Sequence, residues 1–249
     1  MSAAVTLAGG CSTERPTSKS TGPDLTACAA EPDKPLVYLD PKTDQPTGFA
    51  FDIVRTIVEG EAGRLRLKPV PAPDLVFALL DRDCDVIVSK FPITDEARQS
   101  VAFTGSYLDD DLALAVRAPE ADATPTVASM AGRSIGVAPG SSGAVWLGAN
   151  PPGGVTVKQY PGAGDLFAAL RKRDIDGAVV DRAVAAHRST LDDSIRITEV
   201  IPTGRELGFA VRPDDPSTLR LLDRGLERLR SDGRYDAIRA HWLGDAPPL

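Results

Sequence analysis

With 249 residues, of which 42% are hydrophobic and 25% charged, the chain is long enough to bury one large core or two smaller ones. Its formal net charge is −7, and no stripe of Lys and Arg offers the field that phosphate groups require, which argues against nucleic-acid binding. No apolar segment reaches the length needed to cross a bilayer.

The N-terminal residues have the pattern that ends a lipoprotein signal peptide. Small and apolar residues, VTLAGG, stand directly before Cys11, where such a peptide is cut and the cysteine acylated. Residues 12–23 are rich in Ser, Thr and Pro without periodicity, which is typical of a flexible tether. We therefore expect residues 1–11 to be a partial lipoprotein signal, with Cys11 anchoring the protein to the outer face of the cytoplasmic membrane. The alternative is a disordered tail with an incidental cysteine.

Two further cysteines, Cys28 and Cys84, lie in and just before predicted strands. In an oxidising compartment they could pair as a disulfide, and the alternative is two buried free thiols. Neither these cysteines nor the distant pair His187 and His241 form a metal-ligand pattern. We expect no metal and no cofactor.

The first part of the chain alternates between strand and helix patterns. The predicted elements are a strand at 24–28, a turn-rich hairpin at 40–48, a helix from 49 with Ile53, Ile57 and Val58 on one face, a strand at 65–70 and a helix at 75–80. Strands that alternate with helices predict right-handed crossovers and a mainly parallel sheet.

Residues 83–107 combine the features of a pocket wall. The β-branched run Val86–Val88 predicts a buried strand, and the chain then turns at Pro92. Thr94 can cap a short helix, and a second extended segment follows at 101–104.

The second part of the chain lies between two extended segments of similar sequence, DLALAVR ending at Arg117 and ELGFAVRP beginning at Glu206. The elements predicted between them are strands at 132–136, 155–159 and 175–180, with helices at 144–147, 165–173 and 182–187. The C-terminal helices carry Leu219, Leu222, Leu226 and Leu229 at helical spacing.

Three segments resemble the bacterial extracellular solute-binding proteins of family 3, which deliver amino acids and similar polar solutes to ABC importers. They are SKFPITDEARQSVAFTGSYL, GFAFDIVRTIVEGEAG and the ending GRYDAIRAHWLG, and the resemblance extends from Leu25 to Gly244. It implies an α/β, two-lobed periplasmic-binding-protein-like fold of type II, with a mainly parallel sheet flanked by helices in each lobe and two hinge strands. We expect lobe 1 at 24–115 and 206–249, and lobe 2 at 116–205.

The resemblance also implies where a ligand binds. At the position of Asp181, which ends a hydrophobic strand, the family has an Asp that receives the ligand's ammonium group; the alternative is a helix N-cap. The segment containing Ser141 and Ser142 opens a helix, so its free N–H groups and hydroxyls suit an anion, unless one Ser only caps the helix.

The chain departs from the family pattern at its carboxylate clamp. Members that bind α-amino acids usually have Arg at the position of Ala97, whereas here Arg98 comes one residue later. Lys90 could replace the missing cation, or be a solvated lysine at the rim. Asp33 stands where the family has an aromatic residue. A solute with an amine and a differently placed acidic group would suit Asp181 and Lys90.

These features predict a monomeric binding protein, not an enzyme, that closes on a small polar solute and passes it to an ABC permease. The sequence lacks the elbow, phosphate-loop and zinc motifs of common enzymes. One alternative is a dehydratase on the same fold, in which Glu31, Asp33 or Asp181 acts as acid or base. Another is an accessory binding protein of a quinoprotein dehydrogenase, which has cysteines placed like Cys28 and Cys84 but no ITDEAR-like turn.

Overall fold

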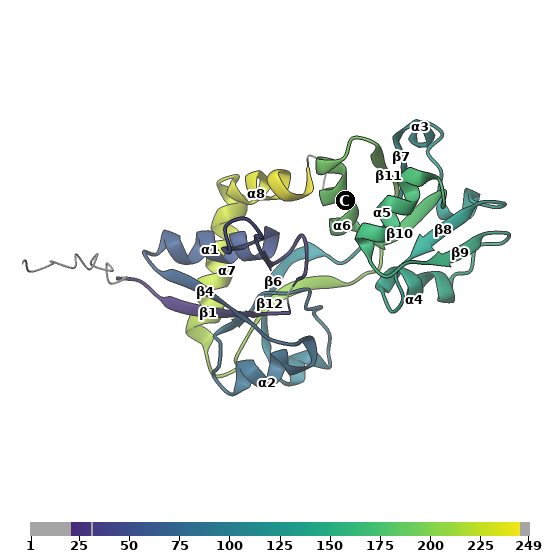
Figure 1. The fold of residues 1–249 in the computed structure, drawn as a ribbon. Coiled ribbons are helices and arrows are strands. Elements are labelled where there is room, and N and C mark those ends of the chain that lie inside the picture. Colours follow the sequence, from purple (N-terminus) through teal and green to yellow (C-terminus); the bar gives the residue numbers. More distant parts are fainter. Residues whose placement is uncertain (1–20, 31, 245–249) are drawn as a thin grey trace, which may run out of the picture.

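The computed structural model describes residues 21–30 and 32–244, which form two lobes side by side (Figure 1). The elements of lobe 1 are β1 (Asp24–Ala29), β2 (Tyr38–Leu39), β3 (Pro46–Thr47), α1 (Phe49–Gly60), β4 (Arg64–Pro69), η1 (Ala72–Asp74), α2 (Leu75–Leu80), β5 (Val86–Ile87), η2 (Ala97–Gln99), β6 (Ala102–Asp109), β12 (Glu206–Val211), α7 (Pro216–Ser231) and α8 (Arg234–Leu243). Those of lobe 2 are β7 (Leu112–Arg117), α3 (Ala118–Ala121), η3 (Val127–Ser129), β8 (Ser134–Val137), α4 (Ser142–Ala149), β9 (Thr156–Gln159), α5 (Ala163–Lys172), β10 (Gly177–Asp181), α6 (Arg182–Leu191) and β11 (Ile195–Ile201).

Each lobe is built on a five-stranded sheet, in the order β4-β1-β5-β12-β6 in lobe 1 and β11-β7-β10-β8-β9 in lobe 2. Strands joined by helical crossovers pair in parallel, as β1 does with β4 and β5. The strands next to the crossings between lobes pair antiparallel, as β12 does with β5 and β6 and β7 with β10 and β11. The parallel pairing expected from the alternating pattern therefore covers only part of each sheet, because a chain returning from the other lobe enters the sheet from the opposite direction.

The two crossings between the lobes lie side by side. The chain leaves lobe 1 through Asp110 and Asp111, between β6 and β7, and returns through residues 202–205, between β11 and β12. The backbone N–H of Asp110 donates to the Arg205 carbonyl at 2.9 Å, and the Thr203 N–H donates to Asp111 Oδ1 at 3.1 Å. Strand β7 belongs to the sheet of lobe 2. Lobe 1 therefore ends at the first crossing, earlier in the chain than residue 115, which was its expected end.

The core of lobe 1 forms where α1 and α7 pack against the sheet. Ile53, Ile57 and Val58 of α1 are buried in this core, as their spacing predicts. A side chain at Gly225 of α7 would collide with Ile57, so this glycine allows the two helices to approach closely.

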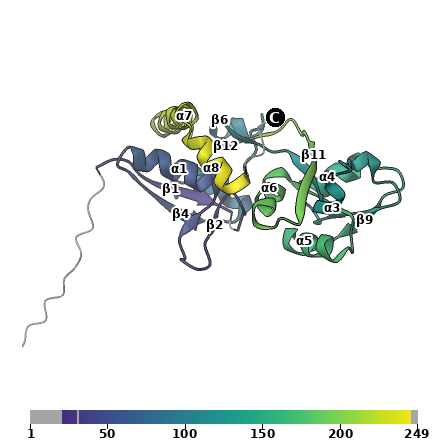
Figure 2. The same ribbon diagram turned by 90° about the horizontal axis from the view of Figure 1, so that it is seen from above.

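Helix α6 of lobe 2 packs against α8 of lobe 1, as the view from above also shows (Figure 2). Ala186 of α6 belongs to the hydrophobic core of lobe 1. His187 Nδ1 lies 2.9 Å from the carbonyl oxygen of Trp242, and the Trp242 indole N–H donates to Asp52 at 3.0 Å. The lobes are thus in contact beside the crossings as well as through them.

Cys28 of β1 and Cys84, which precedes β5, are joined by a disulfide in the structure, with their Cα atoms 5.7 Å apart. Both cysteines are buried in a hydrophobic cluster of lobe 1 that includes Leu79 and Ile87. The predicted signal, Cys11 and the tether up to residue 20 lie outside the described residues, as does Glu31. Within the described part of the chain, no helix is long and apolar enough to cross a membrane.

We predict that loss of the disulfide lowers the free energy of unfolding by about 2–4 kcal/mol, because the bond restricts the unfolded chain over 56 residues. Urea unfolding of the wild type with and without reductant measures this change. The Cys28→Ala/Cys84→Ala variant is the control, since reductant should not alter its midpoint. An unchanged wild-type midpoint after reduction would show that the bond does not contribute to stability.

Candidate functional site

An ammonium group of the protein lies at the junction of the two lobes. Lys90, which follows β5 in lobe 1, places its Nζ 2.6 Å from Asp181 Oδ1 of lobe 2. The same Nζ lies 3.3 Å from Ser142 Oγ of lobe 2 and 3.2 Å from Asp110 Oδ1 at the first crossing. An ammonium has three N–H donors, and these three oxygens are acceptors within reach of them. The Lys90 and Asp181 side chains are only 24% and 26% exposed, so the contact is partly shielded from water.

The local fold explains why Asp181 and Ser142 lie side by side. Val179 and Val180 of β10 are buried in lobe 2, and Asp181 follows them as the last residue of the strand. The buried strand thus fixes the position of Asp181. Asp181 occupies the N-cap position of α6, but its side chain makes no cap hydrogen bond and contacts Lys90 instead. A Cβ at Gly143 would lie 2.5 Å from the Val179 carbonyl oxygen, so only glycine lets the start of α4 approach β10 this closely.

Asp33 holds the backbone that carries Lys90. Its Oδ2 accepts hydrogen bonds from the Lys90 backbone N–H at 2.8 Å and from the Ser89 hydroxyl at 3.2 Å. Burial raises the pKa of Asp33 above its usual value, although these two hydrogen bonds oppose the change. The carboxylate in the place of the family's aromatic residue therefore fixes the strand end and adds negative charge beside Lys90.

Asp110, which lies beside Lys90, is paired with a second cation as well. Asp110, only 5% exposed, also contacts Arg205 of the second crossing, with Arg205 Nη2 2.9 Å from Asp110 Oδ2. Burial raises the pKa of Asp110, which the two nearby cations oppose. For Lys90, burial alone would lower the pKa, but attraction to and hydrogen bonding with Asp181 and Asp110 raise it above its usual value. Lys90 is therefore a charged ammonium at neutral pH.

The other predicted site residues have different roles in the structure. Ser141 caps α4: its hydroxyl accepts from the Ala144 N–H at 3.2 Å and donates to the Ala138 carbonyl at 2.8 Å. Arg98 is exposed on η2, and its guanidinium lies over the Phe103 ring at 5.7 Å. The structure thus brings together Asp33, Lys90, Ser142 and Asp181, and leaves Ser141 and Arg98 out of this cluster.

Sequence reasoning missed three residues of the cluster. Ser89 and Asp110 contact Asp33 and Lys90, and Arg205 contacts Asp110. A signal for Asp110 was present, because three consecutive aspartates, 109–111, stand just before the segment that resembles a hinge strand. An acidic run at a crossing between lobes predicts a partner cation.

Little space is left among these groups. The cavity between Asp33, Lys90, Asp110 and Asp181 has a volume of about 20 Å³, which is room for a water molecule but not for a solute. A solute that binds between the lobes must therefore displace the Lys90 ammonium, separate the lobes, or do both.

A two-lobed fold with paired crossings and a polar cluster between the lobes is the architecture of a solute-binding protein. The family model of the bacterial extracellular solute-binding proteins, family 3, matches residues 25–245. The chain belongs to this family.

Named relatives are distant in sequence but span most of the chain. The L-cystine-binding protein TcyJ of Escherichia coli is 24% identical over 199 residues, which cover 80% of this chain and 74% of the relative. An arginine-binding protein of ABC transport in the same organism is 26% identical and covers 79% and 81%. A probable histidine-binding protein of Neisseria gonorrhoeae is 26% identical and covers 89% and 88%.

Solved structures show the same fold. The second substrate-binding domain of Lactococcus lactis GlnP, in an open conformation, superposes with a TM-score of 0.81 at 21% identity, covering 91% of this chain and 98% of that one. An ancestral cationic amino acid solute-binding protein superposes with a TM-score of 0.80 at 24% identity, covering 88% and 95%.

We predict that Lys90 and Asp181 are energetically coupled. In a double-mutant cycle of Lys90→Met and Asp181→Asn, urea unfolding should give a coupling of about 1–3 kcal/mol, because Lys90→Met removes the cation beside Asp181 and Asp181→Asn leaves Asp110 as the carboxylate beside Lys90. Because the pKa of Lys90 is raised in the folded state, the coupling should be complete from neutral pH up to about pH 10.4 and decline as the pH rises further.

The exposed pair Arg196 and Asp193, 3.8 Å apart, provides the matched control for this cycle. Its coupling should be close to zero, because water screens both charges. Equal coupling in the two cycles would contradict a special role for the contact between the lobes.

Proposed function

We propose that this protein captures a small polar solute outside the cytoplasmic membrane and passes it to an ABC permease. The observation that carries the proposal is the set of acceptors, Asp181 and Ser142 from lobe 2 and Asp110 from the crossing, around one ammonium group. A site that binds an ammonium between two lobes suits a solute that carries an amine, whose binding joins the lobes.

The solute that fits this site best is a zwitterion. Its ammonium takes the place of the Lys90 ammonium, and its acidic group pairs with the displaced Lys90 side chain. This exchange compensates for the missing arginine, since Ala97 stands where members that bind α-amino acids have their clamp. The relatives named for binding arginine, histidine and cystine support an amino acid or a related compound, because each of these molecules has both charged groups.

Hinge motion supplies the capture step. The lobes are connected by the two crossings at residues 110–111 and 202–205, and short segments of this kind can absorb the rotation of one lobe against the other. The solute favours the closed form only to the extent that it binds that form more tightly. In this proposal the protein acts as a monomer held at the membrane by lipid on Cys11, which leaves the lobes free to meet the permease.

One observation favours a second candidate, a dehydratase. The carboxyl group of Asp33 lines the small cavity of the cleft, and burial raises its pKa, which is the direction of change expected for an acid catalyst. An ancestral amino-acid-binding protein described as a precursor of cyclohexadienyl dehydratase superposes with a TM-score of 0.67 at 22% identity. The hydrogen bonds of Asp33 to the Lys90 backbone and Ser89 assign it to holding the strand end, so binding remains the first proposal.

Calorimetry and thermal shift with amino acids, betaines, polyamines and opines test the proposal. We predict saturable stabilisation by a zwitterionic amine, with weaker binding of its quaternary ammonium analogue, which has no N–H donors. Product formation, detected by mass spectrometry, would support the dehydratase instead.

Once a solute is found, Asp181→Asn should weaken its binding by about 10- to 100-fold, the worth of one charge-assisted hydrogen bond. Asp193→Asn, at a fully exposed position outside the cleft, is the matched control and should leave the affinity unchanged. An unchanged affinity in Asp181→Asn would exclude this residue as the ammonium acceptor.

A further inference from the structure

Lys90 projects from the tip of a tight turn that follows β5. The Phe91 N–H donates a hydrogen bond to the Ser89 carbonyl at 2.8 Å, which makes Lys90 the central residue of a three-residue turn. The chain enters this turn from the sheet, where the Val88 N–H donates to the Cys28 carbonyl at 2.8 Å. Beyond the turn, the chain pairs with the start of β12. The direction of the Lys90 side chain therefore depends on how this turn is held.

One peptide group of the turn is held at both of its polar ends. It joins Ser89 to Lys90, and its N–H donates to Asp33 Oδ2 at 2.8 Å. Its carbonyl oxygen, that of Ser89, accepts a hydrogen bond from the Tyr107 hydroxyl at 3.0 Å. Ser89 is only 3% exposed, so its carbonyl depends on donors within the protein. Because the peptide group is planar, holding its two ends fixes its orientation and with it the direction in which the turn presents Lys90.

The Tyr107 ring is fixed in the core of lobe 1. It is fully buried and stacks on Phe209 of β12, with the ring centroids 4.3 Å apart. Burial raises the pKa of the Tyr107 hydroxyl well above its usual value, and the nearby carboxylates of Asp33 and Asp110 add to this change. The hydroxyl therefore keeps its proton at neutral pH and acts as a donor.

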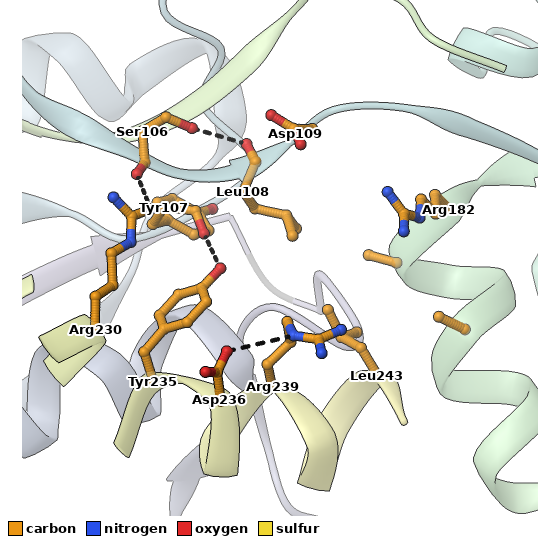
Figure 3. Close-up of a pocket in the computed structure, with 12 residues that line it drawn as sticks. Ser106, Tyr107, Leu108, Asp109, Arg182, Arg230, Tyr235, Asp236, Arg239 and Leu243 are labelled. Atoms are coloured by element: carbon orange, nitrogen blue, oxygen red, sulfur yellow. Dashed lines mark hydrogen bonds and ion pairs between the residues drawn. The ribbon is translucent and has the colours of Figure 1, made fainter. Parts of the chain in front are cut away.

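Strand β6 and the crossing that follows it contact Lys90 at two points. Tyr107 of β6 holds the backbone of the turn, and Asp110, the first residue after the strand, lies 3.2 Å from the ammonium. The carbonyl of Tyr107 accepts a hydrogen bond from the Tyr235 hydroxyl at 2.7 Å, at the wall of a second cavity of about 310 Å³ between α6 and α8 (Figure 3). The segment that leads into the first crossing thus fixes both the backbone and the ammonium of Lys90.

We propose that Tyr107 is a positioning residue of the ammonium site, whose hydroxyl orients the turn so that the Lys90 ammonium reaches the acceptors of lobe 2. This role rests on the proposed function, in which the amine of a solute competes with Lys90 for Asp181 and Ser142. A well-oriented Lys90 is a strong competitor, because the turn keeps its ammonium at a high effective concentration beside these acceptors. Tyr107 therefore affects how tightly an external amine binds, and it does so through Lys90.

The variant Tyr107→Phe removes the hydroxyl and keeps the ring that packs on Phe209, so it should fold. In protein made with isotope-labelled lysine, the Lys90 ammonium should give an NMR signal, since its hydrogen bonds slow the exchange of its protons with water. The variant Lys90→Met, which lacks this signal, assigns it. In Tyr107→Phe we expect the Lys90 protons to exchange about threefold faster or more, which corresponds to the loss of one neutral hydrogen bond. An unchanged exchange rate would overturn the proposal.

The matched control is Tyr235→Phe. It also removes a tyrosine hydroxyl that donates to a backbone carbonyl of lobe 1, but that carbonyl belongs to Tyr107 and lies outside the turn. Urea unfolding should show a similar loss of stability in both variants, whereas Tyr235→Phe should leave the exchange of the Lys90 protons as in the wild type. An equal change of exchange in both variants would indicate a general loosening of lobe 1 and contradict a positioning role.

Propylammonium tests the effect on binding, with the backbone amide signal of Ser142 as the reporter of the site. Its affinity should be about threefold higher or more in Tyr107→Phe than in the wild type, since a poorly oriented Lys90 competes less well. Structural damage to the site would lower the affinity instead, so a lower or unchanged affinity in Tyr107→Phe contradicts the proposal. If propylammonium binds neither the wild type nor Lys90→Met, the ammonium site of the proposed function is wrong, and the exchange of the Lys90 protons still decides the role of Tyr107.

Discussion

One ammonium group of lobe 1, with acceptors in lobe 2 and at the first crossing, joins the two lobes across the cleft. Lys90 belongs to lobe 1 by its backbone, whereas Asp181 and Ser142 belong to lobe 2. A partly shielded charge is stable only when it is paired, so a separation of the lobes costs the free energy of this contact unless water or a solute replaces it. The same acceptors that bind Lys90 can bind the amine of a solute. In the proposed function, the same atoms therefore hold the lobes together and select the solute.

The crossings connect this contact to the rest of the molecule. Asp110 of the first crossing pairs with both Lys90 and Arg205, and Arg205 belongs to the second crossing. The ammonium site is therefore connected to both crossings. The cavity between α6 and α8, which β6 also lines, likewise has walls from both lobes. A change in the angle between the lobes must alter both spaces together, because Leu108 and Ala183 line each of them.

Much of this could be predicted from local sequence patterns. The spacing of Ile53 and Ile57 predicts the buried face of α1, and the end of the valine-rich strand predicts the position of Asp181. Strand β11 had no prediction, and the antiparallel pairings were missed, because periodicity reports which face is buried but not the direction of a strand within the sheet. Arg98 was named from its nearness in sequence to the family's clamp, but a shift of one residue turned its side chain toward Phe103. The contact between Asp110 and Lys90 joins the first crossing to a residue 20 positions earlier in the chain, and no local pattern encodes this pairing.

The most direct test of the account replaces the Lys90 ammonium with a free one. In Lys90→Ala, the distance between spin labels on the two lobes should lengthen and its distribution should broaden. Added propylammonium should restore the wild-type distance in a saturable way, because it supplies N–H donors to Asp181, Asp110 and Ser142, whereas tetramethylammonium, which has none, should not. If the distance is unchanged by Lys90→Ala, or if both ions restore it equally, the ammonium contact does not hold the lobes.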